Sequence, residues 1–433
     1  MKEIFLNRIL IKFVLLSYIY MVNYLNIGCG ILTKKTVISI FLFILILVQQ
    51  FIYVQGDDFD ENEPLKEVIN IETNTYSDRE PPKISASAAI VLDTVSGRIL
   101  YEKNAHSRRA MASTTKIMTA IVAIENGNLD DKVKVSKRAA AIGGSVINLQ
   151  TDEELSLKEL LYGMLIKSGN DAAIAVAEHI GGSVEDFVEM MNKKARELGL
   201  KDTAFKNPHG LDANGHYSTA YELAKITRYA LKNPVFSEMV GIQSTYITNR
   251  NLYTTNEMLS IYPGADGVKT GYTGKAGRCL VTSATREGWR IISVVLNCPS
   301  KSARAQSSKD ILDFAFFNYK IYNLAKAGEI ENSVNVYRGK EDKVSAIIMK
   351  DINIPLTLAE KEKLEKTVYL KSTINAPVFK DIEVGEIRFS IDGKVIAKTG
   401  LKTGDEVAAK KYNDYFGEVL NIWFSLIKKG PND

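Results

Sequence analysis

The feature that most constrains the fold is a pair of strand-forming regions separated by a long helical region. Residues 88–92 and 98–101 flank a Ser-Gly turn and predict a β-hairpin. Strand patterns return at 278–284 and 289–296. Apolar residues at helical spacing predict helices over 113–125, 157–166, 171–180, 184–198, 220–231 and 308–319. We therefore expect an α+β domain whose single sheet is assembled from both ends of the segment.

The composition changes near residue 322. Beyond it, short strand-like runs alternate with turn residues, which predicts a smaller β-rich domain over 322–410 after a first domain over 84–321. The last segment, 411–433, crowds aromatic and aliphatic residues into a short helix. It is too short and too polar to span a bilayer comfortably. We predict an amphipathic helix that either lies on a membrane surface or packs on its own domain.

The chain opens with two apolar stretches. Lys34 and Lys35 precede an uncharged run over 37–48, which has the length of a signal-peptide core. We interpret residues 1–56 as a leader, either cleaved or retained as a transmembrane anchor; both place the rest of the chain outside the cytoplasm. Residues 57–83 are acidic, contain three prolines and lack periodic apolar positions, so we predict a linker.

Charge and side-chain chemistry exclude several classes of function. The net charge is +4 and no long lysine or arginine run occurs, which makes nucleic acid a poor candidate for a partner. The three cysteines lack CxxC spacing and the four histidines form no HExxH motif, so we expect no metal and no cofactor. We predict that Cys279 and Cys298 are buried thiols and that His179 and His216 lie on the surface.

Three short motifs contain residue types suited to nucleophilic catalysis. They are Ser113-Thr114-Thr115-Lys116 (SxxK), Ser168-Gly169-Asn170 (SxN) and Lys269-Thr270-Gly271 (KTG). Each pattern also occurs elsewhere in the chain: SxxK at 425–428, SxN at 333–335, and KTG at 398–400 and 402–404. The patterns alone therefore do not identify a site.

Sequence context distinguishes the three motifs at 113–116, 168–170 and 269–271 from their further copies. A serine and a lysine three residues apart lie on one face of a helix, so the amine can activate the hydroxyl. Ser113 opens a predicted helix, near free N–H groups and the positive end of the helix dipole. The triplet at 269–271 precedes a strand of the first domain, which could form one wall of a cleft. Ser425 lies in the apolar tail, and the later KTG triplets are more typical of exposed hairpins in the β-rich domain.

In this order and with these long gaps, the motifs resemble those of the penicillin-binding proteins and serine β-lactamases. The flanking residues resemble the low-molecular-mass D-alanyl-D-alanine carboxypeptidases of the penicillin-recognising serine hydrolase superfamily. The segments that carry this likeness are 112–119, 167–173, 207–212, 217–220 and 266–273. The resemblance implies an antiparallel sheet flanked by helices. It also implies a peptidoglycan stem peptide ending in D-Ala-D-Ala as substrate, and β-lactam antibiotics as covalent inhibitors.

The resemblance further assigns catalytic roles. Ser113 would be the nucleophile that forms an acyl-enzyme, and Lys116 would be its general base if a desolvated cleft lowers the lysine pKa. Ser168 would relay a proton towards the leaving amine. Asn170 would hold Lys116 and the substrate amide.

Substrate-binding roles follow from the same resemblance. Lys269, assisted by Thr270, would bind the free C-terminal carboxylate. Gly271 would let the backbone approach the ligand closely, and the N–H groups of Ser113 and Tyr272 would form the oxyanion hole. His209 and Asp212 would shape the loop at the cleft edge, either through hydrogen bonds within the loop or by direct participation.

Two competing functions share these motifs. A class A β-lactamase uses a glutamate acting through water, and we find no ExxLN element between Ser168 and Lys269. A non-catalytic scaffold that binds wall peptide or penicillin is disfavoured because all three motifs are complete. Transpeptidation, in which an amine replaces water as the acceptor, stays open.

Overall fold

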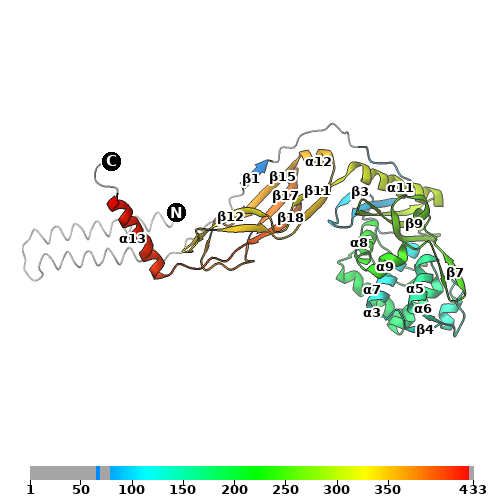
Figure 1. The fold of residues 1–433 in the computed structure, drawn as a ribbon. Helices are drawn as coiled ribbons and strands as arrows, with labels where there is room; N and C mark the ends of the chain where they lie inside the picture. The colour runs from blue at the N-terminus through cyan, green and yellow to red at the C-terminus, as the bar shows by residue number, and fades with distance from the viewer. Residues whose placement is uncertain (1–64, 69–78, 429–433) are drawn as a thin grey trace, which may run out of the picture. The chain divides into compact units, whose positions relative to one another are not determined.

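The computed structural model describes residues 65–68 and 79–428 (Figure 1). The leader predicted over 1–56, with its two alternatives, therefore lies outside the described residues. Within the described part, no helix is both long enough and apolar enough to cross a membrane.

The first domain is built on one five-stranded antiparallel sheet in the order β3-β2-β10-β9-β8. Two strands come from its N-terminal end, β2 (Ala88–Asp93) and β3 (Ile99–Lys103). The other three come from its C-terminal end: β8 (Ala265–Thr273), β9 (Gly277–Arg286) and β10 (Trp289–Cys298). Ala88 on β2 pairs with Leu296 on β10, so the predicted assembly from both ends is confirmed.

Both faces of this sheet are covered. Alternate residues of β2 enter two different cores: Ile90 joins the large cluster beneath the helical region, whereas Val91 joins a smaller cluster with Ile311 and Leu312. The latter two lie on α11 (Lys301–Asn318), which packs along the sheet in Figure 1. Such burial on both sides explains why β2 is an uninterrupted apolar run.

The helical region between the strands contains a 3-10 turn, η1 (Ala112–Thr115), and a set of helices. They are α3 (Lys116–Asn126), α4 (Lys137–Ala141), α5 (Leu157–Ile166), α6 (Asn170–Gly181), α7 (Val184–Glu197), α8 (Ala220–Ala230), α9 (Pro234–Val240) and α10 (Met258–Ile261). It also contains two hairpins, β4 (Lys132–Lys134) with β5 (Glu154–Ser156), and β6 (Ser244–Ile247) with β7 (Arg250–Tyr253).

Capping residues explain several helix boundaries. The Ser156 hydroxyl accepts from the N–H of Glu159, whose carboxylate accepts from the N–H of Ser156, so α5 begins in a capping box. α11 begins at Lys301, and not at 308 as predicted, because the Ser300 hydroxyl accepts from the N–H of Ala303. The other predicted helices are confirmed to within two residues, except that Ser113 opens η1 and the α-helix starts only at Lys116.

The second domain is β-rich, as predicted. Its seven-stranded sheet begins with β1 (Leu65–Val68) and has the order β1-β15-β17-β18-β13-β12-β16. β11 (Lys320–Ala325) pairs separately with β14 (Ile352–Leu356). The sheet contains β12 (Ile330–Tyr337), β13 (Lys343–Ile348), β15 (Leu364–Leu370), β16 (Thr373–Asn375), β17 (Glu383–Ile391) and β18 (Lys394–Thr403). A short helix, α12 (Leu358–Glu362), precedes β15. The hydrophobic core of this second domain includes Val334, Ile387, Phe389 and Leu401.

The prediction that 57–83 is only a linker is wrong at four residues. β1 (Leu65–Val68) pairs antiparallel with β15, with Leu65 opposite Val368. An edge strand is held mainly by backbone hydrogen bonds, so it does not need the alternating apolar pattern on which the prediction relied.

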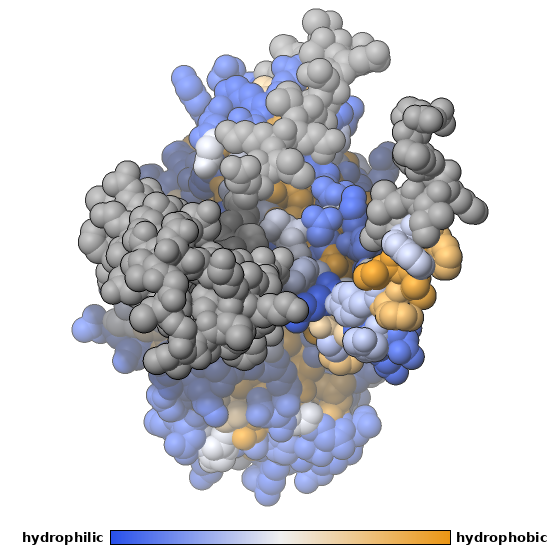
Figure 2. Space-filling view, turned by 90° about the vertical axis from the view of Figure 1, so that its left-hand side faces the viewer, coloured by the Kyte–Doolittle hydropathy of each residue, from blue (hydrophilic) through white to orange (hydrophobic). Residues whose placement is uncertain are grey.

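The tail forms α13 (Tyr412–Lys428). Several of its large apolar side chains are exposed: Tyr412, Tyr415, Phe416, Val419, Trp423 and Phe424. In Figure 2 the hydrophobic residues of this helix appear as an orange group on the side turned towards the viewer.

Candidate active site

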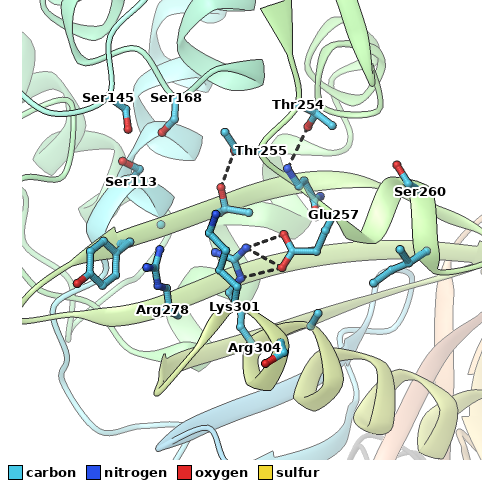
Figure 3. Close-up of a pocket in the computed structure, with 17 residues that line it drawn as sticks. Ser113, Ser145, Ser168, Thr254, Thr255, Glu257, Ser260, Arg278, Lys301 and Arg304 are labelled. Carbon is cyan, nitrogen blue, oxygen red and sulfur yellow. Dashed lines mark hydrogen bonds and ion pairs between the residues drawn. The ribbon is translucent and has the colours of Figure 1, made fainter.

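A pocket of ≈760 Å³ collects all three motifs at the edge strand β8 (Figure 3). Ser113 comes from η1, Ser168 from the turn before α6, and Thr270 from β8. Figure 3 shows the hydroxyls of Ser113, Ser145 and Ser168 gathered on one side of the pocket. The structure therefore brings together residues that are far apart in the sequence.

The SxxK motif has the predicted geometry. Lys116 is the first residue of α3, and its Nζ lies 2.9 Å from Ser113 Oγ. The 3-10 turn that presents Ser113 is fixed by the Thr114 hydroxyl, which donates to the carbonyl of Met111 at 2.7 Å. The nucleophile and the amine are thus within hydrogen-bonding distance.

The amine of Lys116 is enclosed by acceptors and is fully buried. Its Nζ donates to Asn170 Oδ1 at 2.8 Å and to the carbonyl of His209 at 2.6 Å. Burial lowers the pKa of Lys116 well below its ordinary value, and the nearby charge of Lys269 lowers it further, while Asp171 acts in the opposite direction. A lysine held in this way can give up its proton and accept another from a serine.

The SxN motif places Ser168 in the pocket wall and Asn170 beside Lys116. Ser168 has a left-handed backbone, with φ of 67°, and is buried. Asn170 begins α6 and uses both ends of its amide: Oδ1 accepts from Lys116, and Nδ2 donates to the carbonyl of Gly143 at 2.7 Å. The orientation of this amide is therefore fixed by two different parts of the chain.

The KTG motif lies on β8, and its lysine is set behind the pocket wall. Lys269 is buried, and its Nζ donates to the carbonyl of Thr270 at 3.1 Å. Burial and the charge of Arg304 lower the pKa of Lys269 to about 7. Thr270, Gly271 and Tyr272 line the pocket themselves, and the Thr270 hydroxyl lies 2.6 Å from that of Thr255.

Two glycines allow the backbone to close around Ser113. A Cβ on Gly271 would lie 2.9 Å from Ser113 N, and a Cβ on Gly210 would lie 2.0 Å from the carbonyl oxygen of Ala112. Gly210 also has a φ of +89°. Neither position accommodates a side chain without moving the turn that holds the nucleophile.

The loop before α8 is held by a hydrogen bond within the loop and by another to the end of β8. His209 Nδ1 accepts from the N–H of Leu211 at 3.1 Å, and the Asp212 carboxylate accepts from the Thr273 hydroxyl at 2.8 Å. Burial lowers the pKa of His209 to about 3, with a further contribution from Lys116. His209 is therefore neutral near pH 7.

The prediction that His216 lies on the surface is wrong. Its Nδ1 accepts from the N–H of Lys206 at 3.0 Å, and its Nε2 lies 2.8 Å from Thr115 Oγ1. Because the Thr115 hydroxyl donates to Ala112, this geometry places the imidazole proton on Nε2. Burial lowers the pKa of His216 to about 4. His179 is exposed, as predicted, and Cys279 and Cys298 are confirmed as buried free thiols.

The repeated motifs stay outside this site. The second SxN lies on β12, the KTG triplet at 398–400 lies on β18, and the one at 402–404 lies at the end of β18, in the seven-stranded sheet. The second SxxK lies at the end of α13. Sequence context therefore selected the copies that the structure brings together at the pocket.

Sequence reasoning missed several residues of the pocket. Arg304 on α11 lines it, is almost fully buried, and binds the Glu257 carboxylate through Nη2 at 2.5 and 2.6 Å (Figure 3). Arg278 lies over the Tyr272 ring, with its guanidinium carbon 3.7 Å from the ring centre. The loop residue Ser145 was also missed, although the preceding pair of glycines marks a tight loop. No local pattern identifies Arg304, which lies within an ordinary helix.

Known proteins share both domains. A family model described as D-alanyl-D-alanine carboxypeptidase matches residues 75–300, and one described as the C-terminal domain of penicillin-binding protein 5 matches residues 319–409. The carboxypeptidase DacF of Bacillus subtilis is 38% identical over 349 residues, which cover 78% of this chain and 90% of DacF. DacA of Escherichia coli is 32% identical over 354 residues, covering 78% of this chain and 87% of DacA.

Solved structures agree with this relationship. Penicillin-binding protein 5 from Haemophilus influenzae aligns with a TM-score of 0.69 at 31% identity, covering 76% of this chain and 99% of that one. A mutant of the Streptomyces K15 DD-transpeptidase aligns with a TM-score of 0.53 at 36% identity, covering 55% of this chain and 99% of that one. With its motifs gathered at one pocket and both domains matched, the chain belongs to the D-alanyl-D-alanine carboxypeptidase family of low-molecular-mass penicillin-binding proteins.

Proposed function

We propose that this protein removes the terminal D-alanine from peptidoglycan stem peptides ending in D-Ala-D-Ala, through an acyl-enzyme on Ser113. The observation that carries the proposal is the 2.9 Å distance between Ser113 Oγ and the Nζ of a fully buried Lys116. A lysine with a lowered pKa next to a serine hydroxyl is the arrangement that nucleophilic catalysis requires.

In the acylation step, Ser113 Oγ attacks the carbonyl carbon of the penultimate D-alanine while its proton passes to Lys116. The N–H groups of Ser113 and Tyr272 stabilise the oxyanion, and loss of one such donor typically costs about 2.7–4 kcal/mol. The C–N bond then breaks, and the proton reaches the leaving amine through Ser168. Free D-alanine and a Ser113 ester are the products.

In the second step, water attacks the ester carbonyl and transfers a proton to Lys116. The ester bond breaks, the Ser113 oxygen regains a proton, and the shortened peptide leaves. A β-lactam follows the first step, because opening of its ring forms the same ester. The leaving amine stays attached to that adduct.

The substrate carboxylate is bound by the polar wall formed by β8 and α11. Thr270 and Arg304 both line the pocket, and the Nζ of the buried Lys269 donates to the carbonyl of Thr270. Arginine suits this role because its planar fork matches the two oxygens of a carboxylate.

Mass spectrometry of the penicillin adduct tests the nucleophile. We expect one adduct on the peptide that contains Ser113, release of D-alanine from a pentapeptide ending in D-Ala-D-Ala, and loss of both in Ser113→Ala. The matched control is Ser333→Ala, in the second SxN copy, which should label normally. Labelling of Ser113→Ala at another serine would refute the assignment, and rapid penicillin turnover without D-alanine release would indicate a β-lactamase.

We also propose that the enzyme acts outside the cytoplasm and is attached to the membrane through its tail. Support comes from the apolar leader predicted from the sequence and from the exposed aromatic residues of α13, including Phe416 and Trp423. Truncation after Asn413 should release the mature protein from membranes into the soluble fraction. If the truncated protein remains membrane-bound, the tail is not the anchor.

A further inference from the structure

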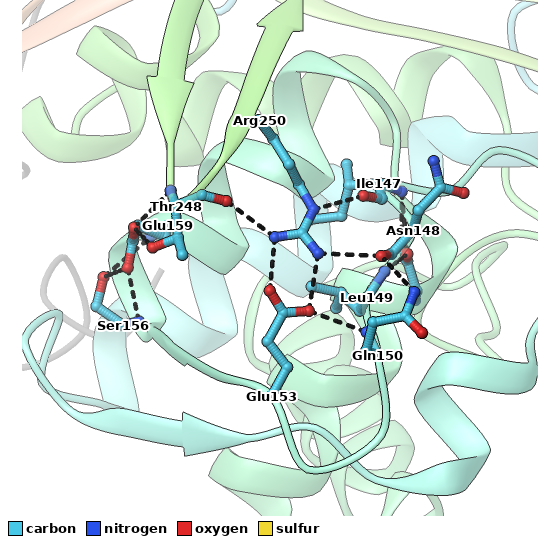
Figure 4. A network of polar contacts seen from close by, with 10 residues as sticks. Ile147, Asn148, Leu149, Gln150, Glu153, Ser156, Glu159, Thr248 and Arg250 are labelled. Atoms are coloured by element: carbon cyan, nitrogen blue, oxygen red, sulfur yellow. Dashed lines mark hydrogen bonds and ion pairs between the residues drawn. The ribbon is translucent and has the colours of Figure 1, made fainter.

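Arg250, on the β6–β7 hairpin, is the centre of a polar network that reaches the loop forming one side of the pocket (Figure 4). We call residues 142–150 the cleft loop. It contains Ser145, which lines the pocket, and it connects α4 to the turn before β5. The hairpin and the cleft loop are remote in sequence, so their contact is a tertiary one.

Every N–H of the Arg250 guanidinium has an acceptor. Nε donates to the carbonyl of Ile147 at 2.8 Å, and Nη2 donates to the carbonyl of Asn148 at 3.0 Å. Nη1 and Nη2 also bind the two Glu153 carboxylate oxygens at 2.7 and 2.8 Å, and Nη1 donates to the carbonyl of Thr248 at 3.0 Å. This is the full donor capacity of arginine, and a lysine has neither the number of donors nor the planar geometry to replace it.

The same stretch of the cleft loop is held from the other side by Asp171. Its buried carboxylate accepts from the N–H of Ile147 at 3.0 and 3.1 Å and from the N–H of Leu149 at 3.1 Å. Arg250 therefore binds carbonyl groups, and Asp171 binds N–H groups, of adjacent residues. Asn148 between them has a left-handed backbone with φ of 62°, a conformation that needs such support.

The cleft loop in turn orients Asn170. The carbonyl of Ser145 accepts from the N–H of Asn170 at 2.7 Å, and the carbonyl of Gly143 accepts from its Nδ2 at 2.7 Å. The remaining end of that amide, Oδ1, accepts from Lys116 at 2.8 Å. A continuous series of hydrogen bonds and backbone thus connects Arg250 to the amine that activates Ser113.

We infer that Arg250 is a positioning residue for acylation: it fixes the cleft loop, and through it the Asn170 amide and the enclosure of Lys116. The inference rests on the proposed role of Lys116 as general base. When the loop loosens, water reaches Lys116 and its contact with Asn170 weakens. Both the rate of acylation and the pH at which the lysine loses its proton then change.

The experiment measures the second-order rate of acylation of the full chain by a fluorescent penicillin between pH 5 and 10. We expect Arg250→Ala to lower this rate ~10–100-fold, in the range of a misplaced catalytic group. Arg250→Lys should restore part of the loss, because it keeps a charge for Glu153 but not the carbonyl contacts. The matched control is Arg196→Ala, which removes an exposed ion pair to Glu189 and should react like the wild type.

The pH profile separates positioning from general loss of structure. The titratable and charged groups around Lys116 are Lys269 from β8, Asp171 from α6 and His209 from the loop before α8. None of them is altered by the substitution, so weaker desolvation should raise the pKa of Lys116 and move the acidic limb of the profile to higher pH.

The inference is overturned if folded Arg250→Ala or Arg250→Lys acylates at the wild-type rate, or if the rate falls with an unchanged pH profile. If Arg250→Ala does not fold, the decision rests on Arg250→Lys. Absence of labelling in the wild type itself would instead refute the proposed function.

Discussion

The two domains differ in whether they bury charged side chains. Among the described residues, the buried acidic and basic side chains all belong to the catalytic domain: Asp93, Lys116, Asp171, His209, His216, Glu222, Lys269 and Arg304. The buried polar residues of the β-rich domain are Thr399 and Thr403. Burying charge is costly unless partners compensate for lost water. The domain that contains the pocket carries this cost, and the other one does not.

The KTG triplets show the difference within one tripeptide. Lys269 is 1% exposed, and its pKa is lowered to about 7. The side chain of Lys398 is 66% exposed, and its Nζ lies 3.5 Å from Glu386 on the sheet surface. The same tripeptide therefore forms either a buried strand segment beside the pocket or part of an ordinary surface strand, depending on what covers it.

The largest effect on the acylation rate is expected from substitution of the buried Lys269 in the KTG triplet of β8. Lys269→Met, which keeps most of the side-chain volume, should lower the acylation rate ~10²–10³-fold, as removal of a charge at a reacting site does. Because Lys269 lowers the pKa of Lys116, its loss should also move the acidic limb of the pH profile to higher pH. Fluorescent penicillin labelling measures both, and Lys398→Met should change neither. Equal loss in the two variants would contradict the comparison.

The second test measures how acid changes the free energy of unfolding. All four histidines lie in the catalytic domain, so their titration affects the stability of that domain. The pKa of folded His216 is about 4, below its unfolded value of 6.5, so the unfolded chain binds more protons between these pH values. Its contribution to the free energy of unfolding is intact above pH 6.5 and falls by about 3 kcal/mol towards pH 4. In urea unfolding at pH 7.5 and 4.5, His216→Gln should show less loss on acidification than wild type. The exposed His106→Gln should lose as much as wild type.

The smallest effect concerns the carboxylate that holds Arg304. Glu257→Gln can still accept a hydrogen bond but no longer competes with the substrate carboxylate for Arg304, so KM for the pentapeptide should fall up to ~10-fold. Glu257→Ala removes the support as well and should raise KM. Glu386→Gln, which alters the equivalent surface ion pairs of the β-rich domain, is the control and should leave KM unchanged. A KM that moves the same way in both Glu257 variants would show that Glu257 acts by packing alone.

The sequence predicted the elements whose determinants are local. Helices such as α5 follow from apolar spacing and a capping box, and the central strands follow from uninterrupted apolar runs. The SxxK geometry was predictable because three residues of helical backbone fix the distance from Ser113 to Lys116.

What escaped prediction depends on tertiary contacts. His216 can be buried because other parts of the chain supply its hydrogen bonds. Thr115 lies about a hundred residues earlier in the sequence, and the backbone N–H of Lys206 lies ten residues earlier. Arg304 joins the pocket only because α11 packs against the sheet, and Arg250 acts on a loop about a hundred positions earlier in the chain. A hydrogen-bond partner on a remote segment leaves no periodicity to detect.

The pairing of Ala88 with Leu296 governs the order in which this enzyme can mature. Until Leu296 has been synthesised, β2 lacks its neighbour β10, and the sheet that holds β8 against η1 is incomplete. Contacts so distant along the chain form late and slowly. An unfinished chain therefore carries Ser113 without its complete pocket, so reactivity arises only when the last strands join the sheet.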